Sequence, residues 1–299
     1  MNRSQILLNV YHPWKALIVR LVRIKNRILG ILMPGRVARD HVRLFLSPRK
    51  FPLKQWEQTA EQDGERISFG AEFAGGLSAL RWGKGQQRVL IMHGWESRAT
   101  QMQALAQPLV ELGYQVIAID APLHGLSRGE QSNPVQFARA VQAACRDLGP
   151  FHAAVGHSMG CAALAIAREQ GAHINRYVLM ASPANMLDTL RAFAGFMDLP
   201  KTCTALFIQG ISETVGRPAG ELEVGEMLAD GSPDVLLVHA RNDIEVPYQA
   251  MIRIHNKLVQ AKTWTSSSLG HRKLVRDPQV ATLIGQFVST GELIPIAPL

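Results

Sequence analysis

The sequence predicts an α/β protein with a mostly parallel central sheet and helices on both faces. From Arg66 onward, short apolar segments such as 88–92 alternate with segments of helical periodicity, which is typical of this class. The chain has 299 residues, enough for a sizeable core. Its hydrophobic fraction of 47% and charged fraction of 19% exclude a disordered chain.

The predicted elements follow one another along the chain. Strands are expected at residues 66–73, 78–82, 88–92, 115–120, 152–157, 177–180, 235–238 and 262–266. Helices are expected at residues 99–112, 134–148 and 159–170, and from about Asp277 onward. Residues 183–232 interrupt this alternation with apolar side chains at helical spacing. We therefore predict a helical cap insertion there, above the carboxyl ends of the strands, where open α/β sheets bind ligands.

The positive charge of the chain is concentrated at its start. Residues 1–55 contain 12 Lys and Arg residues and one acid, Asp40, a net charge of +11. Residues 56–299 contain 20 Lys and Arg residues and 23 acids, a net charge of −3. We therefore expect a basic N-terminal helical extension over 1–55, followed by one α/β domain over 56–299 that includes the cap.

Residues 5–33 have the pattern of a basic amphipathic helix. Helical spacing groups three arginines on one side and four apolar residues on the other: Arg20, Arg23 and Arg27, and Leu17, Leu21, Ile24 and Ile28. Such helices lie on membrane surfaces, so an anionic membrane is one expected partner. The alternative is a helix packed on the protein's own body or on a second subunit as a homo-oligomer contact.

Several other classes are excluded or disfavoured. No run of about 18 uncharged apolar residues is present, so a transmembrane helix is not expected. The apolar core and cleavage site of a signal peptide are also missing. Cys145, Cys161 and Cys203 are widely spaced and form no CxxC pair, which favours a reducing, cytoplasmic location. Without a metal-ligand cluster, a dinucleotide fingerprint or an aromatic-basic face, we expect no metal, no cofactor and no nucleic acid.

One motif carries the catalytic chemistry. Residues 156–160 read GHSMG, which matches the G-x-S-x-G pattern between an apolar strand and a helix of small residues. In this context Ser158 is expected on a strained strand-to-helix turn with its hydroxyl exposed. The pattern alone is common by chance, and the strand–turn–helix context makes it specific.

A serine hydroxyl needs a base within reach, and the base needs an orienting acid. On this kind of sheet the expected order is Ser, then Asp or Glu, then His. Asp243 follows an apolar strand at 235–238, and Asp188 and Glu245 are weaker competitors. His271 is expected in a loop after the strand at 262–266, and it is the histidine downstream of Asp243 in such a position.

A tetrahedral intermediate also needs two backbone N–H donors. One is expected from Met159, at the start of the helix after Ser158. The other is expected from Trp95, in the loop after the strand at 88–92. His93, in the same loop, is interpreted as a structural residue rather than as a second base.

On these residues the sequence resembles the α/β-hydrolase superfamily, specifically its serine esterase and lipase branch. The matching segments are HGW at 93–95, DAPLHGLS at 120–127, GHSMG at 156–160, ARNDIEVP at 240–247 and GH at 270–271. The resemblance implies the fold, a Ser158–His271–Asp243 triad and the donors Trp95 and Met159. Ala121–Gly125 departs from the pattern, because many relatives carry a glycine before the histidine. The first 55 residues lie outside the resemblance.

The expected activity is hydrolysis of a carboxylic ester through an acyl-enzyme intermediate. The apolar cap favours a small-molecule apolar acyl ester as substrate. A thioesterase, an amidase or a carbon–carbon bond hydrolase on the same triad is one alternative. A non-catalytic, membrane-associated protein that retains the fold is another, although an intact triad argues against it.

Overall fold

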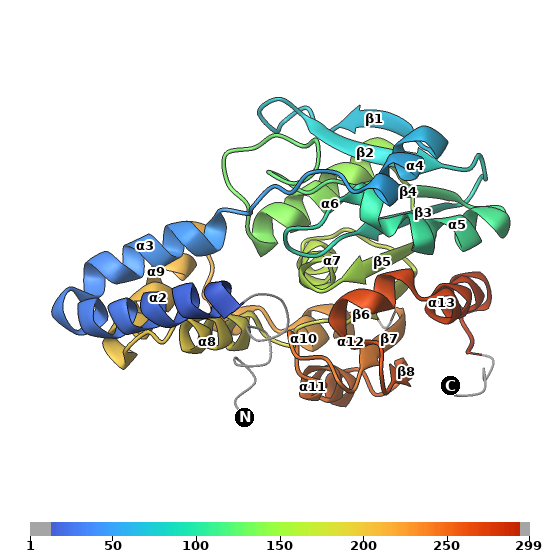
Figure 1. Ribbon diagram of the computed structural model, residues 1–299. Helices are drawn as coiled ribbons and strands as arrows, with labels where there is room; N and C mark the ends of the chain where they lie inside the picture. The colour runs from blue at the N-terminus through green and yellow to red at the C-terminus, as the bar shows by residue number, and fades with distance from the viewer. Residues whose placement is uncertain (1–12, 232, 294–299) are drawn as a thin grey trace. The chain divides into compact units, whose positions relative to one another are not determined.

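The computed structural model describes residues 13–231 and 233–293, which belong to two compact units (Figure 1). Residues 48–184 and 223–299 form the unit that contains the sheet, called the sheet unit here. Residues 1–47 and 185–222 form the other, called the helical unit. Residues 5–12 of the predicted amphipathic helix lie outside the described part of the chain.

The sheet has eight strands in the order β1-β2-β4-β3-β5-β6-β7-β8 (Figure 1). From β4 to β8 all neighbours are parallel, whereas β2 is antiparallel to both β1 and β4. The predicted α/β class with a mostly parallel sheet is therefore confirmed. The strands are β1 (Glu65–Phe69), β2 (Leu77–Trp82), β3 (Arg88–Met92), β4 (Gln115–Ile119), β5 (Ala153–His157), β6 (Arg176–Met180), β7 (Asp234–Ala240) and β8 (Lys262–Ser266).

The strand order creates a switch point beside β3. The chain leaves β3 toward β4 on one side and returns to β5 on the other side. Because the two connections diverge, a crevice forms at the carboxyl ends of β3 and β5, which is where sheets of this type bind ligands. The loops that follow β3 and β5 contain Trp95 and Ser158.

Helices cover both faces of the sheet, because the parallel strands are apolar on both sides. Val89 and Ile91 share a core cluster with Leu105, Leu109 and Phe287, from α5 and α13 on one face. The buried helices α6 and α7, which lie outside that cluster, cover the other face. The helices of this unit are α4 (Gln55–Asp63), η1 (Ala99–Met102), α5 (Gln103–Glu111), α6 (Pro134–Leu148), α7 (Met159–Glu169), α10 (Val224–Ala229), α11 (Gln249–Lys257), α12 (Gly270–Lys273), η3 (Leu274–Arg276) and α13 (Pro278–Thr290).

The helical unit joins two distant parts of the chain. Its helices are α2 (Pro13–Leu32), α3 (Pro34–Leu46), α8 (Met186–Phe196), α9 (Lys201–Val215) and η2 (Ala219–Glu221). Three phenylalanines from different helices pack edge to face or tilted, with ring centres 5.0 to 5.8 Å apart: Phe45, Phe193 and Phe207. The N-terminal segment and the insertion thus share one core, and the role of the insertion as a cap stays a prediction.

Local sequence explains where several elements begin and end. Pro34 is the first residue of α3, where its missing N–H is not needed. The N-terminal helix predicted over 5–33 therefore ends just before it, at Leu32. Asp277 caps α13 by accepting hydrogen bonds from Gln279 N and Val280 N, and the helix begins at Pro278. The strand predicted at 66–73 is shorter, since Gly70 turns the chain with φ of 65°.

A buried polar contact fixes α2 on the rest of the helical unit. The Asn26 amide donates to His41 Nε2 (3.1 Å) and to the carbonyl oxygen of Met197 (2.9 Å). His41 Nδ1–H in turn donates to the Val37 carbonyl oxygen (2.8 Å). Both donors of one amide are therefore used to join α2, α3 and the residue that follows α8.

Replacing Asn26 with leucine should lower the stability of the protein. An Asn26→Leu variant leaves the half-buried Met197 carbonyl oxygen and the buried His41 Nε2 without their donor, which costs about 1–3 kcal/mol in the free energy of unfolding. Urea unfolding followed by circular dichroism measures this loss. The control is Asn256→Leu, on the exposed side of α11, where we expect a change within about 0.5 kcal/mol. Equal midpoints for the two variants would contradict the role of Asn26.

Candidate active site

Ser158 occupies the sharp turn between β5 and α7. Its φ of 53° and ψ of −119° lie in a region that side chains rarely adopt, so the turn is strained. The turn is held by hydrogen bonds from Ser158 N to Met180 O (2.8 Å) and from Cys161 N to Ser158 O (2.9 Å). A Cβ at Gly160 would clash with the carbonyl oxygens of Met92 and His93, which explains the second glycine of the motif. The strand–turn–helix context expected for Ser158 is present.

Asp243 and His271 are brought together from loops that follow two neighbouring strands. His271 Nδ1 donates to Asp243 Oδ2 at 2.8 Å, and both side chains are buried. The other oxygen, Oδ1, accepts from the backbone N–H groups of Glu245 (2.8 Å) and Val246 (2.9 Å). The carboxylate therefore has a fixed orientation, and Nε2 is the ring nitrogen of His271 left for another partner. His271 lies in the short helix α12 and not in the loop that the sequence predicted.

The two weaker competitors for the acid are engaged elsewhere. Glu245 forms a two-pronged ion pair with Arg272, at 2.8 and 3.2 Å. Asp188 belongs to α8 of the helical unit, where Arg191 lies one turn away at 3.9 Å. The structure pairs only Asp243 with His271 among these three carboxylates.

His157 is a neighbour of His271 for which sequence reasoning found no role. Its Nε2–H donates to the carbonyl oxygen of His271 (3.1 Å), and the two ring centres are 4.8 Å apart. Burial lowers the pKa of His157 to about 3, so its ring is neutral. It therefore acts as a positioning residue for the backbone of α12. Its place beside Ser158 in the motif is the only sequence signal that could have indicated it.

Two more neutral histidines hold the loop that contains Trp95. His93 Nε2 accepts from Ala121 N–H (3.0 Å), and His124 Nε2 accepts from Glu96 N–H (3.1 Å). Burial lowers their pKa values to about 4 and about 3, respectively. Each ring therefore remains an acceptor for a backbone N–H at neutral pH. These contacts support the interpretation of His93 as a structural residue, and His124, the histidine of the segment at 120–127, makes a second contact of the same kind.

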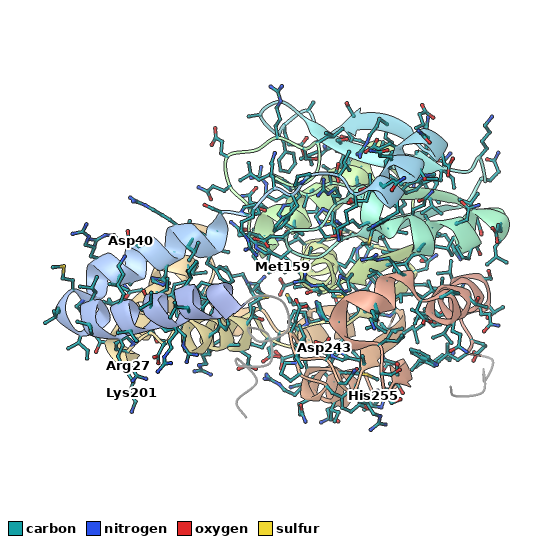
Figure 2. All side chains as sticks on the ribbon, viewed as in Figure 1. Arg27, Asp40, Met159, Lys201, Asp243 and His255 are labelled. Carbon is teal, nitrogen blue, oxygen red and sulfur yellow. The ribbon has the colours of Figure 1, made fainter. Side chains whose placement is uncertain are left out.

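The two expected backbone donors lie at the switch point. Met159 is the first residue of α7, where helix geometry leaves the backbone N–H without a partner in the helix (Figure 2). Trp95 is half-buried in the loop after β3, with its ring 5.2 Å from that of His124 and 6.2 Å from that of Phe137. The Trp95 ring thus packs against two buried rings.

Ser158 and His271 line one cavity of about 390 Å³. Its apolar lining residues are Phe51, Pro52, Trp95, Met102 and Val275. Phe51 and Pro52 belong to the extended segment at 48–54, which lies in the sheet unit although it falls within the predicted N-terminal extension. Arg98 fixes this segment by donating to the carbonyl oxygen of Phe51 (2.6 Å). No group of three potential metal ligands is found in residues 13–231 and 233–293.

Comparisons with known proteins agree with this architecture. A family model described as the alpha/beta hydrolase family matches residues 89–284, more than half of the chain. No curated protein sequence matches the chain. The fold is similar to that of an esterase from Pyrococcus furiosus, with 17% identity, a TM-score of 0.61, and coverage of 82% of this chain and 97% of that one.

Two further solved structures share the fold. One is an esterase from Exiguobacterium antarcticum, with 15% identity, a TM-score of 0.56, and coverage of 75% of this chain and 99% of that one. The other is a thioesterase domain from the curacin biosynthetic pathway, with 17% identity, a TM-score of 0.56, and coverage of 76% and 99%. Together with the strand order and the family match, these likenesses lead to one conclusion: the chain belongs to the alpha/beta hydrolase family.

Proposed function

We propose that the protein is a serine hydrolase that cleaves a carboxylic ester through an acyl-enzyme intermediate. The observation that carries this proposal is the hydrogen bond between His271 Nδ1 and Asp243 Oδ2, beside a serine on a strained turn in the same cavity. This arrangement has the parts that activate a hydroxyl: a nucleophile, a base and an acid that orients the base.

The reaction proceeds in two halves. Ser158 Oγ attacks the acyl carbonyl carbon while His271 Nε2 takes the hydroxyl proton, and Asp243 stabilises the resulting imidazolium. The N–H groups of Met159 and Trp95 donate to the oxyanion. His271 then gives the proton to the leaving alcohol, and the ester bond breaks. Water attacks the acyl-enzyme with His271 again as base, which releases the acid and restores Ser158.

The cavity supports an acyl ester of modest size. About 390 Å³ is within the range of small-molecule sites, and the apolar lining residues suit an acyl or aromatic group. The same steps cleave a thioester, because both bonds pass through the same oxyanion and acyl-enzyme. We place the oxygen ester first, and a substrate series with matched oxygen and sulfur leaving groups distinguishes the two.

Ser158→Ala should abolish ester hydrolysis. Loss of the nucleophile from a triad of this type costs about 10⁶-fold in kcat, and the fold should remain intact because alanine fits the same turn. Release of p-nitrophenol from acyl esters graded by chain length measures the loss. The matched control is Ser97→Ala, which removes another hydroxyl from the same cavity and should change kcat/KM by only a few-fold. Wild-type turnover in Ser158→Ala would show that the nucleophile is elsewhere.

We also propose that α2 attaches the protein peripherally to anionic membranes. The side of α2 that packs on its own unit contains Asn26 and Gly30, both buried. A Cβ at Gly30 would lie 2.7 Å from Pro200 Cδ, which shows how closely α9 approaches this side. The apolar stripe of the sequence pattern is therefore not the side that packs inside the helical unit.

That apolar stripe remains exposed from Leu17 to Leu32 of α2. Its seven large residues are each 49–69% exposed: Leu17, Ile18, Leu21, Ile24, Ile28, Ile31 and Leu32. An exposed apolar stripe of this length is characteristic of an interaction surface rather than of a solvated helix. No helix in the described part of the chain has the length and hydropathy to cross a membrane.

Positive charge borders the stripe. On the helix, Arg20 and Arg27 flank it on one side and Lys25 flanks it on the other, and all three are exposed, although Arg27 also pairs with Asp198 at 3.0 Å. Residues 17–46 contain seven Lys and Arg residues and one acid, Asp40 (Arg27 and Asp40 are labelled in Figure 2). Near an anionic leaflet each cation contributes about 1 kcal/mol, while the apolar side chains enter the interface. A second protein subunit would cover the stripe without requiring this cationic border.

Vesicle co-sedimentation should show salt-sensitive binding to phosphatidylserine-containing vesicles and little binding to pure phosphatidylcholine. An Ile24→Glu/Ile28→Glu variant should lose most of this binding, because the charges oppose insertion. The control is Val259→Glu, which changes an even more exposed apolar residue of the sheet unit and should bind as the wild type does. Absence of binding, together with a dimer in light scattering that the double variant disrupts, would instead identify the stripe as a contact between two copies.

A further inference from the structure

The cavity around Ser158 carries more positive charge than the unit that contains it. Its wall includes five cations (Arg49, Lys54, Arg98, Arg272 and Arg276) and two carboxylates (Glu96 and Glu245), a net charge of +3. The whole sheet unit contains 20 Lys and Arg residues and 19 acids, a net charge of +1. The charge at the cavity is therefore local, and it falls on the wall that a substrate of Ser158 must pass.

Three of the five cations are neutralised by carboxylates of the protein. Arg49 donates to both oxygens of Glu96 (2.8 and 2.7 Å), and Arg272 pairs in the same manner with Glu245. Arg98 lies 3.3 Å from the buried Glu57 and also holds the backbone of Phe51. These arginines have structural partners, so they are not the groups that await a ligand.

Lys54 and Arg276 differ, because neither forms an ion pair with a carboxylate within residues 13–231 and 233–293. Both are nevertheless anchored. The Lys54 backbone N–H donates to Glu57 Oε2 (3.0 Å) at the start of α4. The guanidinium carbon of Arg276 lies 4.5 Å from the centre of the Trp56 ring, a cation–π contact that holds it against α4. Two uncompensated cations thus come from adjacent elements to the wall of one cavity.

We infer that the substrate is an anionic acyl ester, whose carboxylate or phosphate group binds Lys54 and Arg276 while its ester carbonyl reaches Ser158. This inference rests on the proposed hydrolase function and names its substrate class. Arginine and lysine recognise both kinds of anion through charge-assisted hydrogen bonds. A cavity wall with unbalanced positive charge also attracts such substrates from solution. The apolar lining then contacts the carbon chain between the two groups.

The test compares an anionic ester with its neutral twin. For the p-nitrophenyl monoester of glutaric acid we expect a kcat/KM about 10- to 100-fold above that of its methyl-capped form, mainly through KM and decreasing with salt. A second pair, a hexanoyl ester of glycerol phosphate and the same ester of glycerol, places the anion on the alcohol side. The pair with the larger ratio identifies which of the two anions fits the site better, a carboxylate on the acyl side or a phosphate on the alcohol side.

Lys54→Met and Arg276→Met, each of which keeps an apolar chain without the charge, should bring the anionic-to-neutral ratio toward one. Lys273→Met removes an exposed cation that does not line the cavity and should keep the wild-type ratio. Calorimetric titration with glutarate provides a readout that needs no turnover: wild type binds, and Lys54→Met binds several-fold more weakly. Turnover of neutral esters with no preference for anions and no glutarate binding would overturn this inference alone. If no ester is cleaved but glutarate binds through Lys54, the hydrolase proposal fails and the anion site stands.

Discussion

The hydrogen bond between Asp243 and His271 depends on the pairing of two strands and on the backbone contacts that orient both side chains. Its acid follows β7 and its base follows β8, so the parallel pairing of these strands brings the two loops to one edge of the sheet. Two backbone N–H groups fix one carboxylate oxygen, and His157 holds the carbonyl group of His271. A carboxylate held in this manner selects one tautomer of the imidazole, with Nε2 free to accept a proton.

The second constraint is the reversal of strand order beside β3. It brings the loop with Trp95 and the turn with Ser158 to adjacent strands, although about 60 residues separate them in the sequence. The strain at Ser158 and the neutral histidines beneath the loop then fix local geometry within that crevice. The path of the chain, rather than one motif, therefore brings the proposed nucleophile and the expected backbone donor to the same crevice.

Much of the fold and of the candidate site could be predicted from the sequence, because the sequence signals for them are short-range. The GHSMG motif, the apolar strands and the residues that follow them have short-range signatures, so the α/β class and the positions of Ser158, Asp243 and His271 on the chain followed from them. Contacts between distant segments left no such signature. The contact of His157 with His271 had only its place in the motif as a signal, and nothing in the sequence indicated that Phe51 and Lys54 line the cavity.

The N-terminal helix is a second case in which the sequence pattern did not determine a tertiary contact. Periodicity identified its apolar and basic sides, but the side that packs was decided by the polar Asn26 and by Gly30, whose small size admits α9. A pattern of hydrophobic residues alone favours the apolar stripe as the buried side. The stripe is exposed because the tertiary contacts of Asn26 and Gly30 turn the opposite side of α2 toward the rest of the helical unit.

The proposed triad is tested most directly by covalent labelling with a fluorophosphonate, followed by peptide mass spectrometry. We expect a single adduct on the peptide that contains Ser158. Labelling should be about 10⁴-fold slower in Asp243→Asn, because the imidazole then adopts the wrong tautomer. Glu245→Gln, which changes the neighbouring carboxylate that pairs with Arg272, should label nearly as fast as the wild type. Labelling at another residue, or a large loss in Glu245→Gln with none in Asp243→Asn, would contradict the central role of the Asp243–His271 hydrogen bond.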